Sequence, residues 1–450
     1  MSKSLSQPLG LARFSWVAVC LLLGLMCFFQ ILNFLNYADM DFRIYYDASL
    51  ALRHGEDMFA AWNPDSPLTY IYPPLLAILF IPLTLLPLEV AAAVWTVISM
   101  LLLFACLWVG AKEVVRRFDG SCDVATFPVI ILVAILLSLP RIKAEIDQGQ
   151  VDYLILLGII GSLALLKKHP FLAGVVLGLV ANVKYQTIIF IPLIVIRGWW
   201  STFLGFVLGS IGVALCGALV IGWDVNLAYL QESLSSLFLL FGGEAPDKGG
   251  PLVFPLEWVE SVSLSSTFAR WAQALEWSTN GAYLMISLSG ALCLAVGWAI
   301  YFFNGVPLFR GRYGVRGRTA ACFQGLIALE WTGLLVAVLA FAPQTKMRHM
   351  AILILLMILV AQFLVVKRAG VSRFPLLLST IFFVLAMVLP LQTNSEGFTM
   401  GARELWRANG GVIFFVLLNL FCALWTGCAW VSASQQRDRS DELIPSSPDH

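Results

Sequence analysis

The stretch IYPPLLAILFIPLTLLPLEVAAAVWTVISMLLLFACLWVGA, residues 71–111, decides the fold class of this chain. It is apolar for about forty residues and is broken once, by Pro-Leu-Glu at 87–89. A helix that crosses a membrane needs about 20 predominantly apolar residues. The stretch therefore predicts two membrane segments rather than one, and it indicates a polytopic membrane protein.

The composition of the whole chain agrees with this interpretation. Of 450 residues, 60% are hydrophobic and only 12% are charged, whereas soluble proteins carry about 25% charged residues. This excludes a soluble enzyme, a disordered scaffold and a secreted disulfide domain. The net charge of +1 offers no basic face for nucleic acid. The nine cysteines form no C-x-x-C and no Cys/His cluster, so we expect no metal site.

Further apolar runs predict an all-α protein with about 12–13 transmembrane helices, in a single membrane domain that covers 1–450. The run 171–196 is interrupted by Asn182, Lys184 and Gln186, which suggests a broken or kinked pair. The clear spans are expected at 14–36, 199–222, 281–304, 320–341, 349–366, 374–391 and 410–432, and shorter runs occupy 127–140 and 150–166.

Positively charged loops predict the orientation, because Lys and Arg favour the cytoplasmic side of a membrane. Such loops lie at 305–319 and 367–373, and the tail 434–450 also carries arginines. We therefore expect both termini in the cytoplasm and the loops 37–70 and 223–280 on the opposite side. One region conflicts with this orientation. Lys112, Arg116 and Arg117 can be cytoplasmic only if one segment of 71–111 is short or re-entrant; otherwise the positive-inside rule fails there.

The two outer loops differ in composition. Loop 37–70 is rich in Asp and Glu, and its residues 40–54 are expected to form a short helix that Gly55 ends. Loop 223–280 is rich in Ser, Gly, Pro and Trp, with a Gly-rich stretch at 242–250 that predicts a flexible tip.

Asp41 begins the first candidate site, together with Tyr45, Tyr46 and Tyr72. A carboxylate held at the membrane surface beside aromatic rings could act as a general base. The alternative is structural: Asp41 would only stabilise the N-terminus of its helix, and the tyrosines would form an interfacial aromatic belt.

Two further groups of polar residues interrupt apolar sequence. Gln150 and Asp152 stand at the entrance of a span, where unpaired polar groups cost several kcal/mol; they could pair with each other or with Arg141 and Lys143. Lys184 lies inside an apolar run. An ionisable residue there is a functional candidate by default, with snorkelling to the surface as the alternative.

The fourth group is Lys346, Arg348 and His349, at the junction of two strong spans. The positive-inside rule disfavours three such groups on the outer side, so an anionic ligand such as phosphate would offset them. The alternative is an ordinary basic turn beside lipid headgroups. Asp41 and this basic group could take opposite roles around one substrate.

These segments together resemble glycosyltransferase family 87, whose members are GT-C-type integral membrane enzymes. The family includes polyprenol-phosphate-mannose-dependent α-mannosyltransferases of phosphatidylinositol mannoside synthesis. The resemblance is carried first by Asp41-Phe42, Tyr45-Tyr46, Gly55, Tyr70, Tyr72-Pro73-Pro74, Pro82-Leu83, Leu86-Pro87, Gly149-Gln150-Val151, Ala173-Gly174, Gly178-Leu179 and Lys184.

The later part of the chain follows the family pattern more loosely. Ser261-Val262-Ser263-Leu264 with Arg270 is similar to the family's N-Q-S-L…R segment, with Asn and Gln replaced. Ala342-Pro343 with His349 is similar to its S-P-x-S-W-x-H-H pattern. Here Arg348 replaces the first His and Lys346 replaces the Trp, and Asp152 stands where Asn is more usual.

The resemblance implies an inverting glycosyltransferase that moves a sugar, by family majority mannose, from a polyprenyl-phosphate donor to a lipid or glycan acceptor. The reaction would occur on the outer side of a bacterial inner membrane and would need no cofactor, since the lipid-linked donor is a substrate. Asp41 would be the general base. The donor phosphate would meet Lys184, Arg270, Lys346, Arg348 and His349, and the sugar or acceptor would be positioned by Tyr45, Tyr46, Tyr72, Gln150 and Asp152.

A transporter or flippase for a lipid-linked sugar or another anion is the alternative from a different class. It should place ionisable groups near the membrane midplane. Only Lys184 and Glu330 look like midspan candidates, and no internal repeat is evident.

Overall fold

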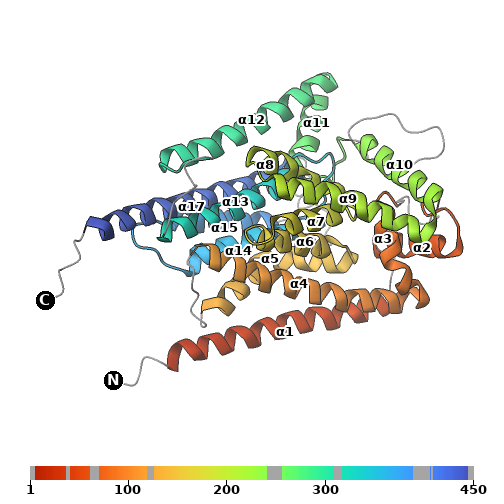
Figure 1. The fold of residues 1–450 in the computed structure, drawn as a ribbon, viewed down its shortest axis with the longest axis horizontal. Coiled ribbons are helices and arrows are strands. Elements are labelled where there is room, and N and C mark those ends of the chain that lie inside the picture. The colour runs from red at the N-terminus through yellow and green to blue at the C-terminus, as the bar shows by residue number, and fades with distance from the viewer. Residues whose placement is uncertain are drawn as a thin grey trace, which may run out of the picture.

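The computed structural model describes residues 6–36, 41–60, 70–118, 126–240, 256–308, 317–388, 406 and 409–443. Within these ranges every regular element is a helix (Figure 1). Eight helices there are long and apolar enough to cross a membrane, and five shorter apolar helices accompany them. The prediction of an all-α polytopic membrane protein is confirmed. The number of apolar segments also agrees, although only eight are long enough to span by themselves.

The helices follow one another with short connections. The first half of the chain contains α1 (Ser6–Asn36), α2 (Asp41–His54), α3 (Pro74–Phe80), η1 (Ile81–Leu85), α4 (Leu88–Phe118), α5 (Thr126–Gln148), α6 (Asp152–Leu165), α7 (Pro170–Ala181), η2 (Tyr185–Ile189) and α8 (Phe190–Ile196). The second half contains α9 (Trp200–Ile221), α10 (Trp223–Leu240), α11 (Leu264–Ala274), α12 (Thr279–Phe303), α13 (Gly317–Phe341), η4 (Met347–Leu353), α14 (Ile354–Val365), α15 (Phe374–Val388) and α17 (Gly411–Leu443).

The stretch 71–111 forms two segments of very unequal length. The α3 helix has seven residues and continues into five residues of the tighter η1, whereas α4 after Pro87 has 31. The break at 87–89 is therefore confirmed. Because α3 with η1 is short, only α4 of these two segments is long enough by itself to cross a membrane.

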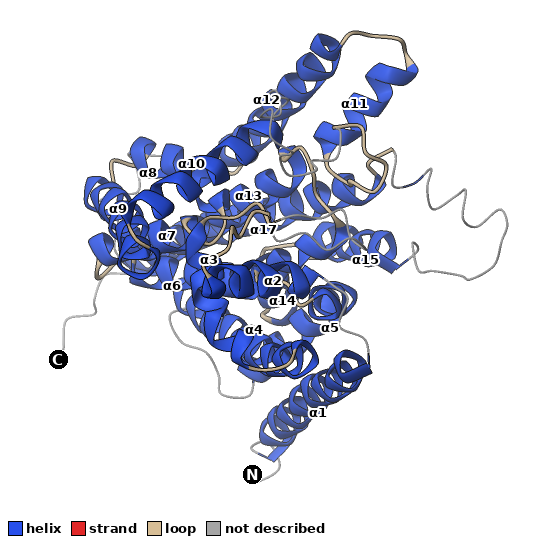
Figure 2. Cartoon of the chain, turned by 90° about the vertical axis from the view of Figure 1, so that its right-hand side faces the viewer, coloured by secondary structure: helices blue, strands red, loops and turns tan. Residues whose placement is uncertain are grey.

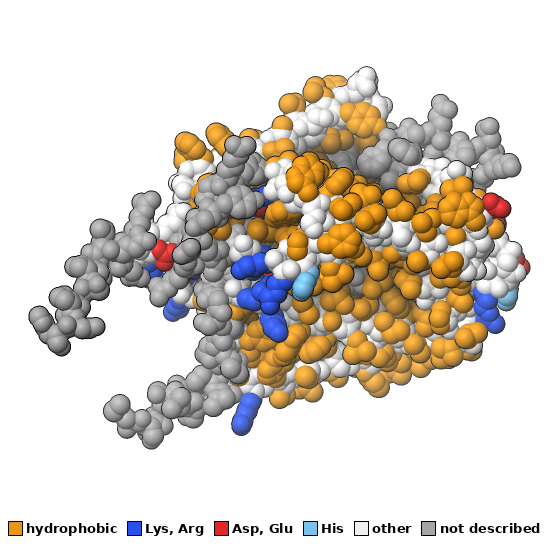
Figure 3. All heavy atoms as spheres, viewed as in Figure 1, with side chains coloured by type: hydrophobic (Ala, Val, Ile, Leu, Met, Phe, Trp, Pro, Cys, Tyr) orange, Lys and Arg blue, Asp and Glu red, His pale blue; other side chains and the backbone are white. Residues whose placement is uncertain are grey.

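Basic side chains gather at the end of the bundle opposite α2. The start of α1 and the end of α17 lie at that end (Figure 1). Arg117, near the end of α4, donates to the Leu163 carbonyl near the end of α6 at 2.6 Å. Arg368, after α14, donates to Ser434 Oγ on α17 at 2.5 Å. A broad band of hydrophobic side chains separates the charged groups of the two ends (Figure 3).

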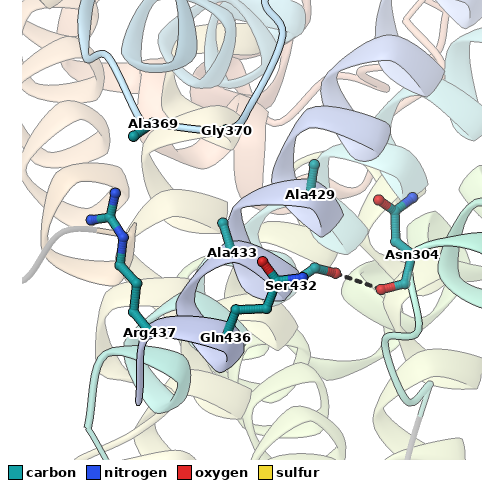
Figure 4. A pocket seen from close by; sticks show the side chains of 8 residues that line it. All are labelled: Asn304, Ala369, Gly370, Ala429, Ser432, Ala433, Gln436 and Arg437. Atoms are coloured by element: carbon teal, nitrogen blue, oxygen red, sulfur yellow. Dashed lines mark hydrogen bonds between the residues drawn. The ribbon is translucent and has the colours of Figure 1, made fainter. Parts of the chain in front are cut away.

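A polar pocket of about 360 Å³ also lies at this basic end (Figure 4). It is bounded by the end of α12, the loop after α14 and the last turns of α17, and Ser432 Oγ donates to the Asn304 carbonyl at its edge at 2.5 Å. The pocket thus lies at the other end of the bundle from α2 (Figure 1).

Several local predictions can be compared directly with the helices. The short helix at 40–54 is confirmed as α2, and Gly55 after it has φ +75°. The broken pair at 171–196 is also confirmed, because α7 ends at Ala181 and η2 starts at Tyr185. Two further regions contain helices that the composition did not predict. The predicted loop 223–280 contains α10 and α11, and α17 continues to Leu443, into the predicted tail. The expected flexible tip at 242–250 lies outside the described residues.

The core of the bundle is built around α14. Ten consecutive residues of this helix, 354–363, are buried, as expected for a helix that is hydrophobic on every side. It packs against α4, α5, α13 and α17. Figure 2, which looks onto the opposite end from the basic one, shows α2 and α3 in front of this core.

Glycines allow α7 and α9 to pack with their backbones in contact. A Cβ on Gly174 would lie 1.9 Å from the Thr202 carbonyl oxygen, and one on Gly205 would lie 2.1 Å from the Phe171 carbonyl oxygen. Small residues four apart on facing helices are the usual means of close packing in membranes. The pairs Gly174/Gly178 and Gly205/Gly209 therefore place α7, and Lys184 just after it, against α9.

We expect Gly174→Ala to lower the free energy of unfolding by about 2 kcal/mol, because overpacking against backbone atoms cannot be relieved by a rotamer change. The thermal unfolding temperature of the purified protein in nanodiscs would fall accordingly. Gly212→Ala is the matched control: it lies on α9, and nothing is within 4 Å of its added Cβ. Equal unfolding temperatures for the two variants would contradict this packing.

Candidate active site

Asp41 is a buried carboxylate at the first turn of α2, with 5% of its surface exposed. Its Oδ2 accepts a hydrogen bond from Gln150 Nε2 and lies 2.5 Å from Arg348 Nη2. The three residues come from α2, the α5–α6 turn and η4. The fold thus brings three segments that are far apart in the chain to one carboxylate.

Gln150 joins Asp41 to a second buried ion pair. Its Oε1 accepts from the Tyr45 hydroxyl at 2.7 Å and from Lys184 Nζ at 3.2 Å. Lys184 also donates to Asp152 Oδ1 at 2.6 Å, and these two side chains are 5% and 1% exposed. The ammonium lies 5.2 Å from the Tyr72 ring centre. Lys184 therefore neither snorkels nor stands alone at midspan, because it belongs to this cluster.

The turn between α5 and α6 carries Gln150, and several contacts fix the position of this turn. Gly149 has φ +63°, and a Cβ there would lie 2.7 Å from Phe42 Cβ, so glycine lets α2 approach closely. Trp95 donates to the Gly149 carbonyl at 2.9 Å, and Gln148 accepts from Arg348 Nη1 at 3.3 Å. The turn thus contacts Arg348 through Gln148 and Lys184 through Gln150.

The basic group at 346–349 lies beside Asp41, as the sequence suggested. His349 Nδ1 accepts from the Lys346 backbone at 3.3 Å, which caps η4. His349 is within electrostatic reach of Lys184, Arg348 and Lys346. Burial lowers the pKa of Lys346, and so does the neighbouring Arg348, while Asp41 acts in the opposite direction. An anion near Lys346 and Arg348 would relieve this repulsion.

The segment before α11 fixes the approach to this basic group. Thr345 N donates to Ser261 Oγ at 3.0 Å, Val262 N donates to the Thr345 carbonyl at 2.8 Å, and Ser266 Oγ donates to the Pro343 carbonyl at 2.7 Å. Lys346 Nζ lies 4.6 Å from the Trp258 ring centre. The serines of the altered N-Q-S-L segment therefore act on the backbone of 343–345.

Arg270 occupies a different position from the other predicted cations. Its guanidinium donates to the carbonyls of Trp258 and Ser261 at 2.8 and 3.2 Å, and to Thr267 Oγ1 at 3.2 Å. Burial lowers its pKa to about 10, so it stays charged at neutral pH. These contacts hold the Trp258 loop, whose Trp258 ring Lys346 also contacts, against α11.

The predicted tyrosines divide into two groups. Tyr45 is buried and its ring centre is 5.7 Å from that of Tyr72; burial, Tyr72 and Asp41 all raise the pKa of Tyr45, so it remains a phenol donor. Tyr46 instead donates to the Leu86 carbonyl at 2.7 Å and anchors α2 to η1. Since Tyr45 and Tyr70 are each 1% exposed, they are not part of a lipid-facing belt.

Glu145 is the member of the cluster that the sequence did not suggest. It is 1% exposed, and its Oε1 accepts from the Asp152 backbone N–H at 2.9 Å. Its Oε2 is buried without a hydrogen-bond partner among the described residues. Lys184 and Arg348 lie within its electrostatic reach. A signal existed, because an acidic residue near the end of an apolar helix needs a polar partner.

Glu330 lies outside this cluster. It accepts from Arg197 Nη2 at 2.5 Å and from the Tyr301 hydroxyl at 2.8 Å. These contacts tie α8, α12 and α13 together. The two residues that a transporter would use at midspan are therefore both engaged in other ways, Lys184 in the polar cluster and Glu330 in this tether.

The chain is similar in sequence to known mannosyltransferases. Over 302 residues the chain is 26% identical to the "Polyprenol-phosphate-mannose-dependent alpha-(1-2)-phosphatidylinositol pentamannoside mannosyltransferase" of Mycobacterium tuberculosis (strain CDC 1551 / Oshkosh), covering 61% of this chain and 66% of that protein. Over 127 residues it is 28% identical to the protein of that name from Mycolicibacterium smegmatis, covering 28% of this chain and 29% of that protein. The alignments thus span just under two thirds of the first relative and under one third of the second.

No solved structure matches the chain significantly. Residues 70–315 match the model of glycosyltransferase family 87, which is more than half of the chain. The matched range includes Gln150, Asp152 and Lys184 and excludes Asp41 and the basic group at 346–349. With this match and the relatives above, the chain belongs to glycosyltransferase family 87.

Proposed function

We propose that the protein is an inverting glycosyltransferase that transfers mannose from a polyprenyl-phosphate donor to a hydroxyl of a lipid or glycan acceptor. One observation carries the proposal: Asp41 is buried at the end of an apolar bundle, held by Gln150 and beside Arg348. Family membership supports the class of reaction. The printed names of the relatives support polyprenol-phosphate-mannose as the donor.

Asp41 is the general base in this proposal. Its contacts with Gln150 and Arg348 both go to Oδ2, which leaves Oδ1 to accept the proton of the acceptor hydroxyl. As that proton leaves, the acceptor oxygen bonds to the anomeric carbon, and the bond from this carbon to the phosphate oxygen breaks on the opposite face. Polyprenyl phosphate departs as a stable anion, so cations suffice to stabilise it.

Arg348 and Lys346 are the donor-phosphate ligands in this proposal, with His349 beside them. Arginine suits a phosphate because its planar guanidinium can donate two parallel hydrogen bonds. Arg348 is paired with Asp41 in the structure. When a donor binds, the guanidinium can exchange this carboxylate for the phosphate, and the exchange releases Asp41 to accept a proton.

The distribution of charge supports the proposed side of the reaction. Arg117 and Arg368 lie at the end of the bundle opposite Asp41. Under the positive-inside rule that end faces the cytoplasm. The proposed site then opens on the extracytoplasmic side of a bacterial inner membrane, both termini are cytoplasmic, and the donor's lipid tail stays in the bilayer. The proposal includes no metal and no other cofactor.

Asp41→Asn is expected to lower turnover by about a hundredfold to ten-thousandfold, because the amide cannot accept the hydroxyl proton. Turnover is measured as transfer of labelled mannose from polyprenyl phosphate mannose to acceptors in membranes of the source organism. Asp47→Asn is the matched control on the same helix, where Asp47 pairs with Arg43 at 3.4 Å. It should retain activity, and an Asp41→Asn enzyme as active as the wild type would refute the general-base role.

Arg348→Gln and Lys346→Gln should each weaken binding of polyprenyl phosphate by about tenfold, the loss of one hydrogen bond to a charged group. Binding is measured on purified protein in nanodiscs. Lys143→Gln is the control, because Lys143 is exposed and pairs with Asp147 on α5 near the same end of the bundle. Wild-type affinity in both test variants would remove the basic group from the donor site.

A further inference from the structure

We propose that Glu145, Asp152 and Lys184 form a buried positioning unit that fixes the amide orientation of Gln150 and, through it, the position of Asp41. Lys184 is then a positioning residue and not a ligand of the donor phosphate, and Glu145 gains a role that its sequence context did not suggest. The proposal rests on the function proposed above, because it assigns these residues to the support of its general base.

The first step is the chemistry of the Gln150 amide, which has one acceptor oxygen and one donor NH₂ group. Two donors face its oxygen: the Tyr45 hydroxyl at 2.7 Å and Lys184 Nζ at 3.2 Å. An ammonium has no acceptor capacity, so Lys184 can face only the oxygen of the amide. A flipped amide would set two donor groups against each other and leave Asp41 facing an oxygen. The cation therefore fixes the orientation in which Gln150 donates to Asp41.

The second step is the state of Lys184 itself. Asp152 Oδ1 accepts one of its N–H groups at 2.6 Å, Gln150 accepts another, and the Tyr72 ring lies beside the ammonium. Arg348 is more exposed, with 17% of its side chain accessible against 5% for Lys184. Two of the three N–H groups of Lys184 are therefore already engaged by acceptors in a buried position, whereas Arg348 and Lys346 lie nearer the surface.

The third step is what holds Asp152. Glu145 Oε1 accepts from the Asp152 backbone N–H at 2.9 Å, and the Glu145 carbonyl accepts from the Gln150 backbone N–H at 3.3 Å. Glu145 therefore contacts both ends of the segment 150–152 from the last turn of α5. These two hydrogen bonds fix the backbone of Gln150 and Asp152. They thereby connect α5 to the ion pair between Asp152 and Lys184.

The experiment separates positioning from phosphate binding by measuring kcat, donor KM and polyprenyl phosphate affinity on the same variants. The double variant Asp152→Asn/Lys184→Gln removes both charges of this ion pair together, so neither partner is left without the other. We expect kcat to fall by about tenfold to a hundredfold, the usual effect of a misplaced catalytic group, with polyprenyl phosphate affinity within about twofold of wild type. The single variant Lys184→Arg retains a cation and should therefore have a higher kcat than the double variant.

Glu145 is tested by a pair of variants that differ in one hydrogen bond. Glu145→Ala removes the acceptor for the Asp152 N–H and should lower kcat by about tenfold. Glu145→Gln retains an acceptor oxygen and should keep most of the wild-type kcat. If Glu145→Ala has the wild-type kcat, Glu145 has no part in positioning.

The control for folding is Lys143→Gln/Asp147→Asn, which removes an exposed ion pair from the same end of α5 and should leave kcat and affinity unchanged. Unfolding temperatures of all variants identify any loss that comes from instability. A tenfold loss of polyprenyl phosphate affinity in the folded Asp152→Asn/Lys184→Gln variant, with kcat retained at saturating donor, would overturn the positioning role. Failure of the proposed function is distinct: the wild type itself would then transfer no mannose.

Discussion

The hydrogen bond from Gln150 to Asp41 is the contact on which the rest of the site depends. A carboxylate inside an apolar bundle must find its partners within the protein, because lipid supplies none. Here Gln150 and Arg348 satisfy one oxygen of Asp41. Because Gln150 is itself held by Tyr45 and Lys184, a single amide connects the loop helix α2 with the transmembrane bundle.

The surrounding helices explain how that contact is maintained. The glycine contacts between α7 and α9 bring the end of α7 against its neighbour, and Lys184 follows directly after this end. Gly149 allows Phe42 of α2 to approach the α5–α6 turn. Close packing of backbones at these two places positions the two polar ends of the cluster, so side-chain chemistry at the site depends on residues that carry no side chain.

Much of the fold was predictable, and the site was predictable in part. Apolar runs and their breaks locate helices because lipid allows few other structures, so the break at 87–89 and the interruption around Lys184 were anticipated. The α2 helix was predicted from the position of Gly55 as its end. The helices α10 and α11 were not, because mixed polar and apolar loops carry no such constraint. Glu145 was missed although its place near the end of an apolar helix was a signal. The contacts of Arg270 with the carbonyls of Trp258 and Ser261 depend on how these segments pack, which a linear pattern does not show.

The charges of the cluster explain two departures of this chain from the family pattern. Asp152 stands where Asn is more usual, and Arg348 stands where the pattern has His. The first adds a negative charge beside Lys184, and the second adds a lasting positive charge beside Asp41. Each new charge is thus paired inside the cluster, and the two changes have opposite sign. A neutral residue at 152 would leave Lys184 available to an anion, whereas Asp152 engages it. The proposed division of roles follows from these pairings: Arg348 and Lys346 would meet the phosphate, and Lys184 would hold the amide that contacts Asp41.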